Sequence, residues 1–290
     1  MSTHDLSGPG LRLDRLPRRR RVNHVMEGFA WLAAATAIAI LGIVVWSVAS
    51  KGWSELNLDL VTKSPIPFSL TNAPQGLANA FAGTIVIVGL ATLMALPVGI
   101  LVAVYLNEFA PPAIRNGVGL VLDVLAGVPA IVVGIFVFVL LVSGSGQSGI
   151  KGSFALAILM LPFVARATIE VLALVPNSLR EASLGLGIPQ WRTTLSIVLP
   201  RAIGGIVTGT VLAVARVAGE TAPLLFTSLG NLNWSISLTQ PMASLPVTIY
   251  QYAGSAFQDW VQLAWVGALL VTVGVLVINI LARFALRGGR

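Results

Sequence analysis

The sequence predicts an all-α membrane protein that crosses the bilayer six times, and three observations carry this prediction. Hydrophobic residues make up 56% of the 290-residue chain, charged residues make up only 10%, and the mean hydropathy is +0.88. A soluble globular domain usually carries about 25% charged residues. Six apolar stretches are each long enough for the ~20 residues that a helix needs to cross a bilayer. The positive charges are also distributed unevenly between the connections, which is the bias that orients membrane proteins.

The six apolar stretches follow a polar N-terminal tail. This tail covers residues 1–27 and contains four consecutive arginines at 18–21, next to the first apolar stretch. Such a cluster holds its end of the chain in the cytoplasm. The predicted spans cover residues 28–50, 78–106, 117–142, 153–174, 202–225 and 261–284. They form one membrane domain over residues 28–285, and residues 286–290 follow as a short cytoplasmic tail.

The spans and their connections differ in composition. The third span contains Pro129, and a Gly/Ser-rich turn at residues 143–152 leads from it to the fourth span. In the fifth span, Gly205 and Gly209 form a small-residue face that suits close helix packing. A long loop at residues 226–260 then leads to the sixth span.

The distribution of lysine and arginine predicts the orientation of the chain. Six crossings place both termini on the same side of the membrane. If that side is the cytoplasm, the chain places three lysines outside, namely Lys51, Lys63 and Lys151. Arg166 and Arg216 lie within spans, and the other thirteen of the eighteen Lys and Arg residues lie inside, with Arg283 counted at the cytoplasmic end of the sixth span. This agrees with the positive-inside bias, so the connection at residues 175–200 is predicted to be cytoplasmic.

Several classes of function are excluded by composition. The chain has no cysteine, and its only histidines, His4 and His24, lie in the N-terminal tail, so no cluster has the spacing of a metal site. The Gly/Ser turn at residues 143–152 lacks the Gly-Lys-Ser/Thr sequence of a nucleotide-binding loop. The basic residues lie in tails and on one side of the membrane, which argues against nucleic-acid binding. We therefore expect neither enzymatic activity nor a cofactor.

The connection at residues 175–200 is predicted to contain a short helix. Ser178 and Glu181 have the spacing of a capping box, which favours a helix that begins near them. Gly187 and Pro189 should end this helix after about two turns, because glycine accepts the left-handed cap and proline cannot continue the hydrogen bonding. A helix of roughly 12 Å cannot span a bilayer and is marginal alone in water. It therefore needs a partner surface on which to dock.

The same connection resembles the EAA motif of the membrane subunits of ABC importers. The matching residues are Glu181, Ala182, Ser183, Gly187, Ile197, Leu199 and Pro200, with Ser183 in place of the second alanine. In that family the loop contains the coupling helix, which sits in a groove of the ATP-hydrolysing subunit. The resemblance implies a type I ABC importer permease fold, with Ser178 and these residues coupling the chain to a separate ATPase.

Two arginines within the predicted spans need an explanation. An arginine at bilayer depth costs about 3 kcal/mol on insertion scales, so it normally faces a cavity or a partner. Arg166 and Arg216 are each followed four residues later by a carboxylate, Glu170 and Glu220. Each pair could neutralise itself along one helix face, although Arg before Glu is the less favourable order. Alternatively the guanidinium groups line a path for an anion, since their donors match tetrahedral oxyanions. Asp123 is expected to be an interfacial cap or the partner of a neighbouring arginine.

A second resemblance indicates which anion the path carries. Three stretches look like parts of the A-type permease subunit of phosphate-specific ABC importers: residues 125–134, 215–225 and 242–252. The resemblance extends over about residues 83–283. Arg166 and Arg216 fall where that family places arginines implicated in phosphate passage. The residues implied to line the substrate pathway are Arg216, Arg166, Glu220, Glu170 and Thr221.

The resemblance also implies an assembly in the cytoplasmic membrane. Its expected members are a second, related permease that forms a heterodimer with this chain, two ATP-binding subunits and an extracytoplasmic phosphate-binding protein. The expected substrate is inorganic phosphate, and the surrounding medium is membrane lipid. The chain itself is expected to be a multi-pass transport subunit without an ATPase site.

Other functions stay open at this point. A permease for another oxyanion, such as molybdate or sulfate, would keep the coupling loop but need not carry the signature at residues 215–225. A secondary transporter would need no ATPase subunit. A membrane-embedded enzyme would need a nucleophile or a metal set, and the absence of cysteine and the position of both histidines argue against it.

Overall fold

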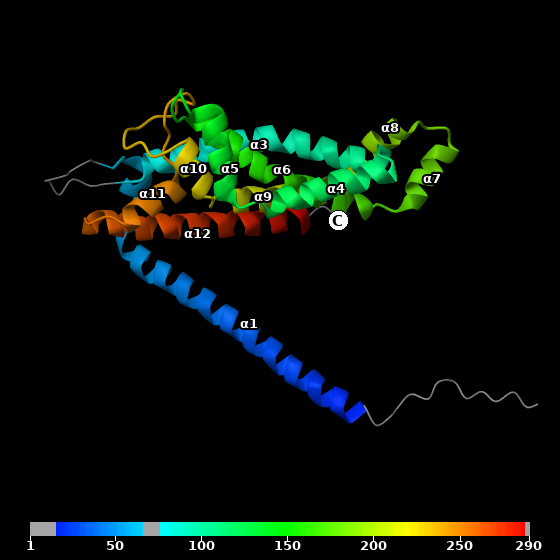
Figure 1. Ribbon diagram of the computed structural model, residues 1–290, viewed down its shortest axis with the longest axis horizontal. Helices are drawn as coiled ribbons and strands as arrows, with labels where there is room; N and C mark the ends of the chain where they lie inside the picture. The colour runs from blue at the N-terminus through cyan, green and yellow to red at the C-terminus, as the bar shows by residue number, and fades with distance from the viewer. Residues whose placement is uncertain (1–15, 66–75, 288–290) are drawn as a thin grey trace, which may run out of the picture. The chain divides into compact units, whose positions relative to one another are not determined.

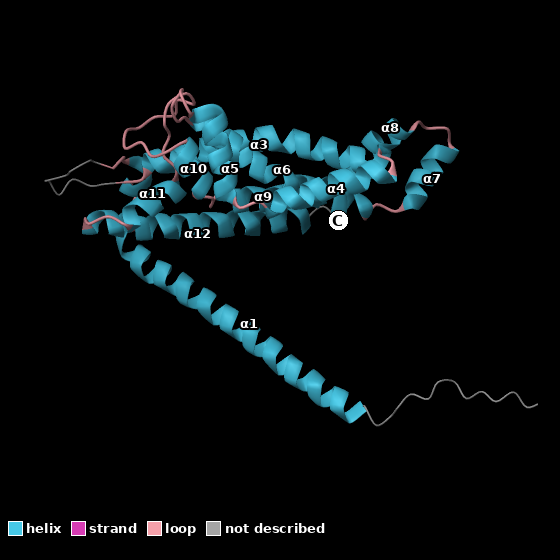
Figure 2. Ribbon diagram, viewed as in Figure 1, coloured by secondary structure: helices cyan, strands magenta, loops and turns pink. Residues whose placement is uncertain are grey.

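The computed structural model describes residues 16–65 and 76–287, and within these ranges all regular secondary structure is helical (Figure 2). Parts of both predicted tails, residues 1–15 and 288–290, lie outside the described residues. The chain divides into two compact units, residues 1–50 and 51–290, which are described separately. The described helices are α1 (Leu16–Gly52), η2 (Trp53–Glu55), α2 (Asp59–Thr62), α3 (Ala78–Val104), η3 (Tyr105–Phe109), α4 (Pro112–Gly127), α5 (Ala130–Val137), η4 (Phe138–Val142), α6 (Gly149–Ala173), α7 (Asn177–Gly185), α8 (Gln190–Thr193), η5 (Thr194–Val198), α9 (Leu199–Val217), α10 (Ala222–Thr227), α11 (Leu245–Ala253) and α12 (Gln258–Arg287).

The first unit is dominated by α1, a single helix of 37 residues. Its length is about 55 Å at 1.5 Å per residue, which exceeds the ~30 Å hydrocarbon core of a bilayer. Large apolar side chains such as Trp31, Ile38 and Trp46 are exposed along it. This helix contains the predicted first span and extends it into the arginine-rich region.

The second unit is a bundle in which α3 and α9 both pack against α6, and α12 packs against α9 (Figure 1). The predicted small-residue face is confirmed: a Cβ atom added at Gly205 would lie 2.5 Å from Val171 Cγ1, and one at Gly209 would lie 2.5 Å from the Ala167 Cβ atom. Backbone groups of α6 and α9 therefore approach closely, as small residues permit. Figure 1 shows α7 and α8 at one end of this bundle and α10 and α11 at the other.

The predicted third span is not one straight helix. The helices α4 and α5 meet at a bend of 95°. Val128 and Pro129 both have extended backbone angles there, with ψ of 128° and 133°. Proline lacks an N–H group and disfavours helical geometry in the residue before it, so the helix ends and restarts. In the described residues five helices are long and apolar enough to cross a membrane, or six if this bent pair counts as one span.

The predicted fifth span also ends earlier than expected. The helix α9 stops at Val217, and the chain restarts as α10 after a short break. The restarted helix packs on α5 and η4: a Cβ atom added at Gly134 would lie 2.6 Å from the Pro223 Cα atom, and the ring centroids of Phe138 and Phe226 are 6.4 Å apart, edge to face. Two interrupted spans therefore meet through the pieces that follow their breaks.

The predicted loop at residues 226–260 contains a helix that hydropathy does not reveal. This helix, α11, packs on α12, and Tyr252 stacks on Trp260 with ring centroids 4.6 Å apart. Its nine residues are too few to register as a membrane span.

Candidate functional site

The predicted coupling helix, α7, has the predicted length but a different start. It covers nine residues from Asn177, and the residue before it, Pro176, has extended backbone angles. Ser178 therefore lies inside the first turn, and no side chain caps the helix. The capping-box prediction was wrong, because the helix begins at Asn177 with Pro176 in the N-cap position, so Ser178 is not the cap residue. The predicted stop is confirmed, since Gly187 has a φ of +76°, the left-handed conformation that glycine accepts.

The residues that match the EAA motif differ in burial: some are buried or half-buried, and the others are exposed. Ser183 is buried, and its hydroxyl lies 2.7 Å from that of Thr193 on α8, so it joins the two arms of the loop. Ile197 and Leu199 are half-buried, while Pro200 is exposed in the first turn of α9. The exposed members of the motif in the short helix and its stop are Glu181, Ala182 and Gly187.

The tip of the coupling loop is apolar as well as exposed. Leu184, Leu186 and Trp191 are 52%, 80% and 54% exposed. An exposed apolar cluster beside a short helix is typical of a surface that binds another protein. This matches the expectation that the helix needs a surface on which to dock.

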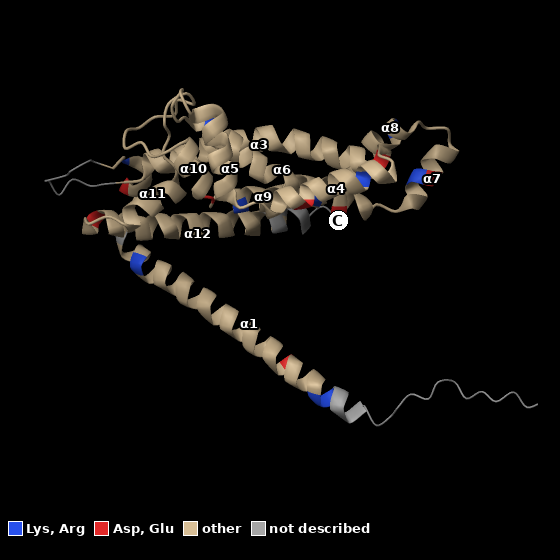
Figure 3. Cartoon of the chain, in the orientation of Figure 1, with Lys and Arg blue, Asp and Glu red and all other residues tan. Residues whose placement is uncertain are grey.

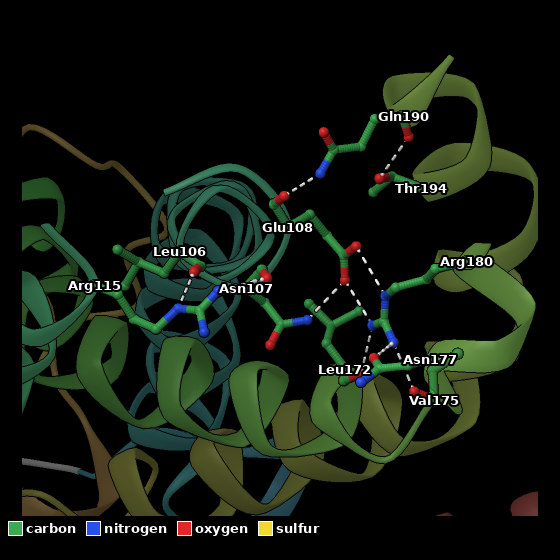
Figure 4. A network of polar contacts seen from close by, with 10 residues as sticks. All are labelled: Leu106, Asn107, Glu108, Arg115, Leu172, Val175, Asn177, Arg180, Gln190 and Thr194. Carbon is green, nitrogen blue, oxygen red and sulfur yellow. Dashed lines mark hydrogen bonds and ion pairs between the residues drawn. The ribbon is translucent and has the colours of Figure 1, made fainter. Parts of the chain in front are cut away.

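A buried ion pair anchors this loop to η3, the helical turn after α3 (Figure 4). The carboxylate of Glu108 is only 4% exposed and accepts two hydrogen bonds from Arg180, at 2.7 Å from Nη2 and 3.1 Å from Nε. The same guanidinium donates to the carbonyl groups of Leu172 and Val175 at 3.0 and 2.6 Å. Arg180 on the coupling helix thus holds both the end of α6 and the turn after α3.

The other arm of the loop contacts the same turn. The Gln190 side chain on α8 donates a short hydrogen bond to the backbone carbonyl of Glu108, and Asn107 donates to the Glu108 carboxylate at 2.7 Å. Arg115, in the first turn of α4, donates to the carbonyl groups of Leu106 and Asn107 at 2.9 and 3.0 Å. Glu108 therefore bonds to both α7 and α8, and the helical turn that contains it is hydrogen-bonded to the start of α4 through Arg115.

The sequence did not single out Glu108 or Arg180 as site residues. The predicted topology places Glu108, between the second and third spans, and Arg180, in residues 175–200, on the same side of the membrane. A search for opposite charges in connections on one side could therefore have identified this pair. The two residues are 72 positions apart, so no periodicity of a single helix relates them.

Arg166 is paired across helices and not along its own. Its Nη2 atom forms an ion pair with Asp123 on α4 and donates to the carbonyl of Gly119 at 2.5 Å. Its Nε atom is buried without a hydrogen-bond partner among the described residues. The alternative in which Arg166 pairs with Glu170 along its own helix is therefore not observed, and Glu170 is exposed. The expectation that Asp123 is the partner of a neighbouring arginine is confirmed. The pair lines a cavity of about 480 Å³ between η3, α4 and the C-terminal half of α6, the end that is predicted to face the cytoplasm.

Arg216 has a different environment. It is exposed, its guanidinium lies 4.5 Å from the ring centroid of Phe163, and no carboxylate in the described part of the chain lies within ion-pair distance. The alternative in which Arg216 pairs with Glu220 is therefore also absent from the described ion pairs, although both residues line one small cavity of about 40 Å³. Thr221 is half-buried at the break between α9 and α10.

The C-terminal half of α4 is what brings the two arginines into one region. Asp123 holds Arg166. Leu125 and Ala126 near the end of α4, and Val128 directly after it, line the cavity of Arg216. The two arginines line separate cavities in this structure. Figure 3 shows how few charged residues the rest of the bundle carries along its length, so these positions are exceptional.

Comparison with known proteins places this geometry in context. Residues 95–288 match the model of a family described as "Binding-protein-dependent transport system inner membrane component". The chain is 43% identical over 268 residues to the phosphate transport system permease protein PstA of Haemophilus influenzae, covering 91% of this chain and 94% of that protein. It is 45% identical over 257 residues to PstA of Yersinia pestis, covering 87% and 86%. It is 39% identical over 271 residues to PstA 1 of Mycobacterium tuberculosis, covering 91% and 87%.

The fold is also similar to that of solved transporters. A chain of the inward-facing MetNI methionine ABC transporter aligns with a TM-score of 0.62 at 17% identity, covering 73% of this chain and 95% of that chain. A chain of a bacterial ABC transporter for import of the acidic polysaccharide alginate aligns with a TM-score of 0.61 at 15% identity, covering 95% and 98%. The predicted type I ABC importer permease fold is thereby confirmed.

Proposed function

The chain belongs to the family of binding-protein-dependent transport system inner membrane components, and from this premise we propose that it is the permease subunit of an ABC importer for inorganic phosphate. The observation that carries the proposal is an identity of 39–45% with phosphate transport system permeases over about nine-tenths of the chain. The arginines at α6 and α9 agree with an anionic substrate, because guanidinium donors match a tetrahedral oxyanion.

The energy for transport comes from separate subunits. The coupling helix α7 sits in a groove of an ATP-binding subunit, and the exposed Leu184, Leu186 and Trp191 supply apolar contact around it. Two such subunits drive the importer, and a phosphate-binding protein delivers the substrate from outside. In this arrangement both termini and residues 175–200 lie in the cytoplasm, which agrees with the distribution of lysine and arginine.

A second permease covers the charged side of the bundle. The side chain of Asp123 is 63% exposed and Arg216 is exposed, although both lie in segments that were predicted to span the membrane. Charged groups at such depth are costly when they face lipid, so they face a protein or a water-filled cavity. A heterodimer with a related permease places the substrate pathway between the two chains, lined here by Arg216, Arg166, Glu220, Glu170 and Thr221.

The structure suggests how the parts act in sequence. Closure of the ATP-binding subunits moves α7, and the ion pair of Arg180 with Glu108 passes this movement to the turn after α3 and to α4. The outward cavity then opens, and phosphate enters opposite Arg216. Hydrolysis of ATP resets the inward-facing state. Binding along the way stays weak, because a site that held the anion tightly would prevent its release.

The test is transport by the reconstituted importer with Arg216→Gln. We expect this variant to assemble with its partners and to hydrolyse ATP but to import no phosphate, because the guanidinium that receives the anion is gone. Arg201→Gln, an exposed arginine at the start of the same helix, is the matched control and should transport normally. Normal phosphate uptake by Arg216→Gln would remove Arg216 from the pathway.

Competition distinguishes phosphate from related anions. Excess molybdate or sulfate should leave uptake of labelled phosphate by the wild-type importer unchanged. Strong inhibition by either anion would instead identify a permease for that oxyanion.

A further inference from the structure

The cavity that Arg166 lines, at the proposed cytoplasmic end of α4 and α6, has the residues of an anion-binding site. A carboxylate of the protein itself, that of Asp123, occupies this site. The cavity measures about 480 Å³ and is lined by two arginines, two asparagines and one aspartate: Arg115, Arg166, Asn107, Asn116 and Asp123. The positive groups outnumber the negative one. An anion is therefore attracted to this cavity and meets Asp123 there.

The contacts of the two arginines differ in how easily they can be exchanged. Arg115 is held by two backbone carbonyl groups, which are fixed parts of the turn after α3. Arg166 also donates to one backbone carbonyl, that of Gly119, but its other partner is a carboxylate whose side chain is 63% exposed within this chain, and its buried Nε–H group has no partner among the described residues. An ion pair that faces a water-filled cavity contributes little to stability, so the carboxylate can leave Arg166 at small cost. The guanidinium group can then donate to another oxyanion in its place.

Phosphate and Asp123 compete for the same guanidinium. Both are oxyanions that accept charge-assisted hydrogen bonds from arginine, and two like charges beside one another repel. The carboxylate is tethered at the site, so it returns as soon as the phosphate moves away. A built-in competitor of this kind shortens the time that an anion spends at Arg166.

We propose that Asp123 is a displaceable counter-ion, which holds Arg166 while the inner cavity is empty and promotes release of phosphate by returning to it. This inference rests on the proposed function and adds a role for a residue outside the predicted pathway. Arg216, which has no carboxylate within ion-pair distance among the described residues, receives the anion without such competition.

The experiment uses the complete importer in proteoliposomes, with ATP and a series of unlabelled phosphate concentrations inside and the loaded binding protein outside. Uptake of labelled phosphate is measured for wild type, Asp123→Asn and Asp123→Glu. With Asp123→Asn we expect internal phosphate to inhibit uptake at concentrations at least about tenfold lower, because the competing charge is gone. Asp123→Glu keeps the charge and should resemble the wild type. Asp259→Asn, an exposed acid at the start of α12, is the matched control and should change nothing.

Two results would overturn the proposal. One is an unchanged sensitivity of uptake to internal phosphate in Asp123→Asn, and the other is a sensitivity in Asp123→Glu that increases as much as in Asp123→Asn. If Asp123→Asn does not assemble, Asp123→Ser replaces it, and failure of both would show that the carboxylate serves folding and not release. If the wild-type importer takes up no phosphate, the proposed function itself is contradicted. The same series with the oxyanion that it does carry would then test Asp123.

Discussion

Two ion pairs in the bundle have the same chemistry and opposite surroundings. Arg180 and Glu108 are sealed, with side chains 18% and 4% exposed, whereas Arg166 and Asp123 are open, with 32% and 63% exposed. A buried pair holds its geometry because separating it strands a charge in a medium of low dielectric constant. The second pair faces the proposed water-filled pathway between the two permeases, where water screens its charges and its partners exchange readily. The sealed pair is therefore suited to transmit force, and the open pair is suited to give way.

The strongest test of the contrast between the two ion pairs is to remove one member of the buried pair. Glu108→Gln should destabilise the protein by about 3–5 kcal/mol, because it leaves Arg180 buried without a counter-charge. Thermal unfolding of the purified importer in detergent measures the effect. Glu170→Gln, which removes an exposed carboxylate, should change stability by less than about 0.5 kcal/mol. Equal effects of the two substitutions would contradict the assignment of Glu108 as the anchor.

A smaller effect is expected where α8 meets the same turn. Gln190→Ala removes one hydrogen bond to the backbone carbonyl of Glu108 and should cost about 1 kcal/mol. The ATP hydrolysis that the loaded binding protein stimulates should fall by more than the basal hydrolysis, because one arm of the loop has lost its link to the membrane helices. Gln251→Ala in α11, at the other end of the bundle, serves as the control. If basal and stimulated hydrolysis fall equally, Gln190 does not take part in coupling.

The smallest effect on stability is expected at the open pair. Asp123→Asn should change the free energy of unfolding by less than about 1 kcal/mol, and even this difference should shrink as salt is added. The measurement compares thermal unfolding of wild type and variant at low and high ionic strength. A large loss that salt leaves unchanged would show that Asp123 and Arg166 are as sealed as Glu108 and Arg180, and the contrast between the pairs would be lost.

The long apolar stretches were predictable because each carries a strong hydropathy signal. Most of the expected spans therefore appear as helices, and the short coupling helix was predictable from Gly187 and Pro189. The break at Pro129 was missed because a proline within an apolar stretch can kink a helix or end it, and packing decides between the two. The helix α11 was missed because its nine residues are too few for a hydropathy window.

The candidate site was predictable in its residue types and not in its pairings. An arginine in an apolar stretch signals an intramembrane function on its own. Its partner is decided by the packing of helices that are distant in sequence, as with Asp123 and Arg166 on α4 and α6. The same holds for Glu108 and Arg180. Local spacing suggested Glu170 and Glu220 as partners, and tertiary contacts prevailed over this local geometry.

The break between α4 and α5 has a consequence for the hydration of the pathway. The last turn of a helix leaves carbonyl groups without intrahelical partners, and non-helical backbone at membrane depth persists only within protein or beside water. The end of α4, including Val128, lines the cavity of Arg216. Water that solvates these carbonyl groups would also reach the guanidinium. In the proposed pathway, phosphate that arrives at Arg216 would not need to shed its whole hydration shell, so the bend would lower the cost of moving a strongly hydrated ion through the membrane.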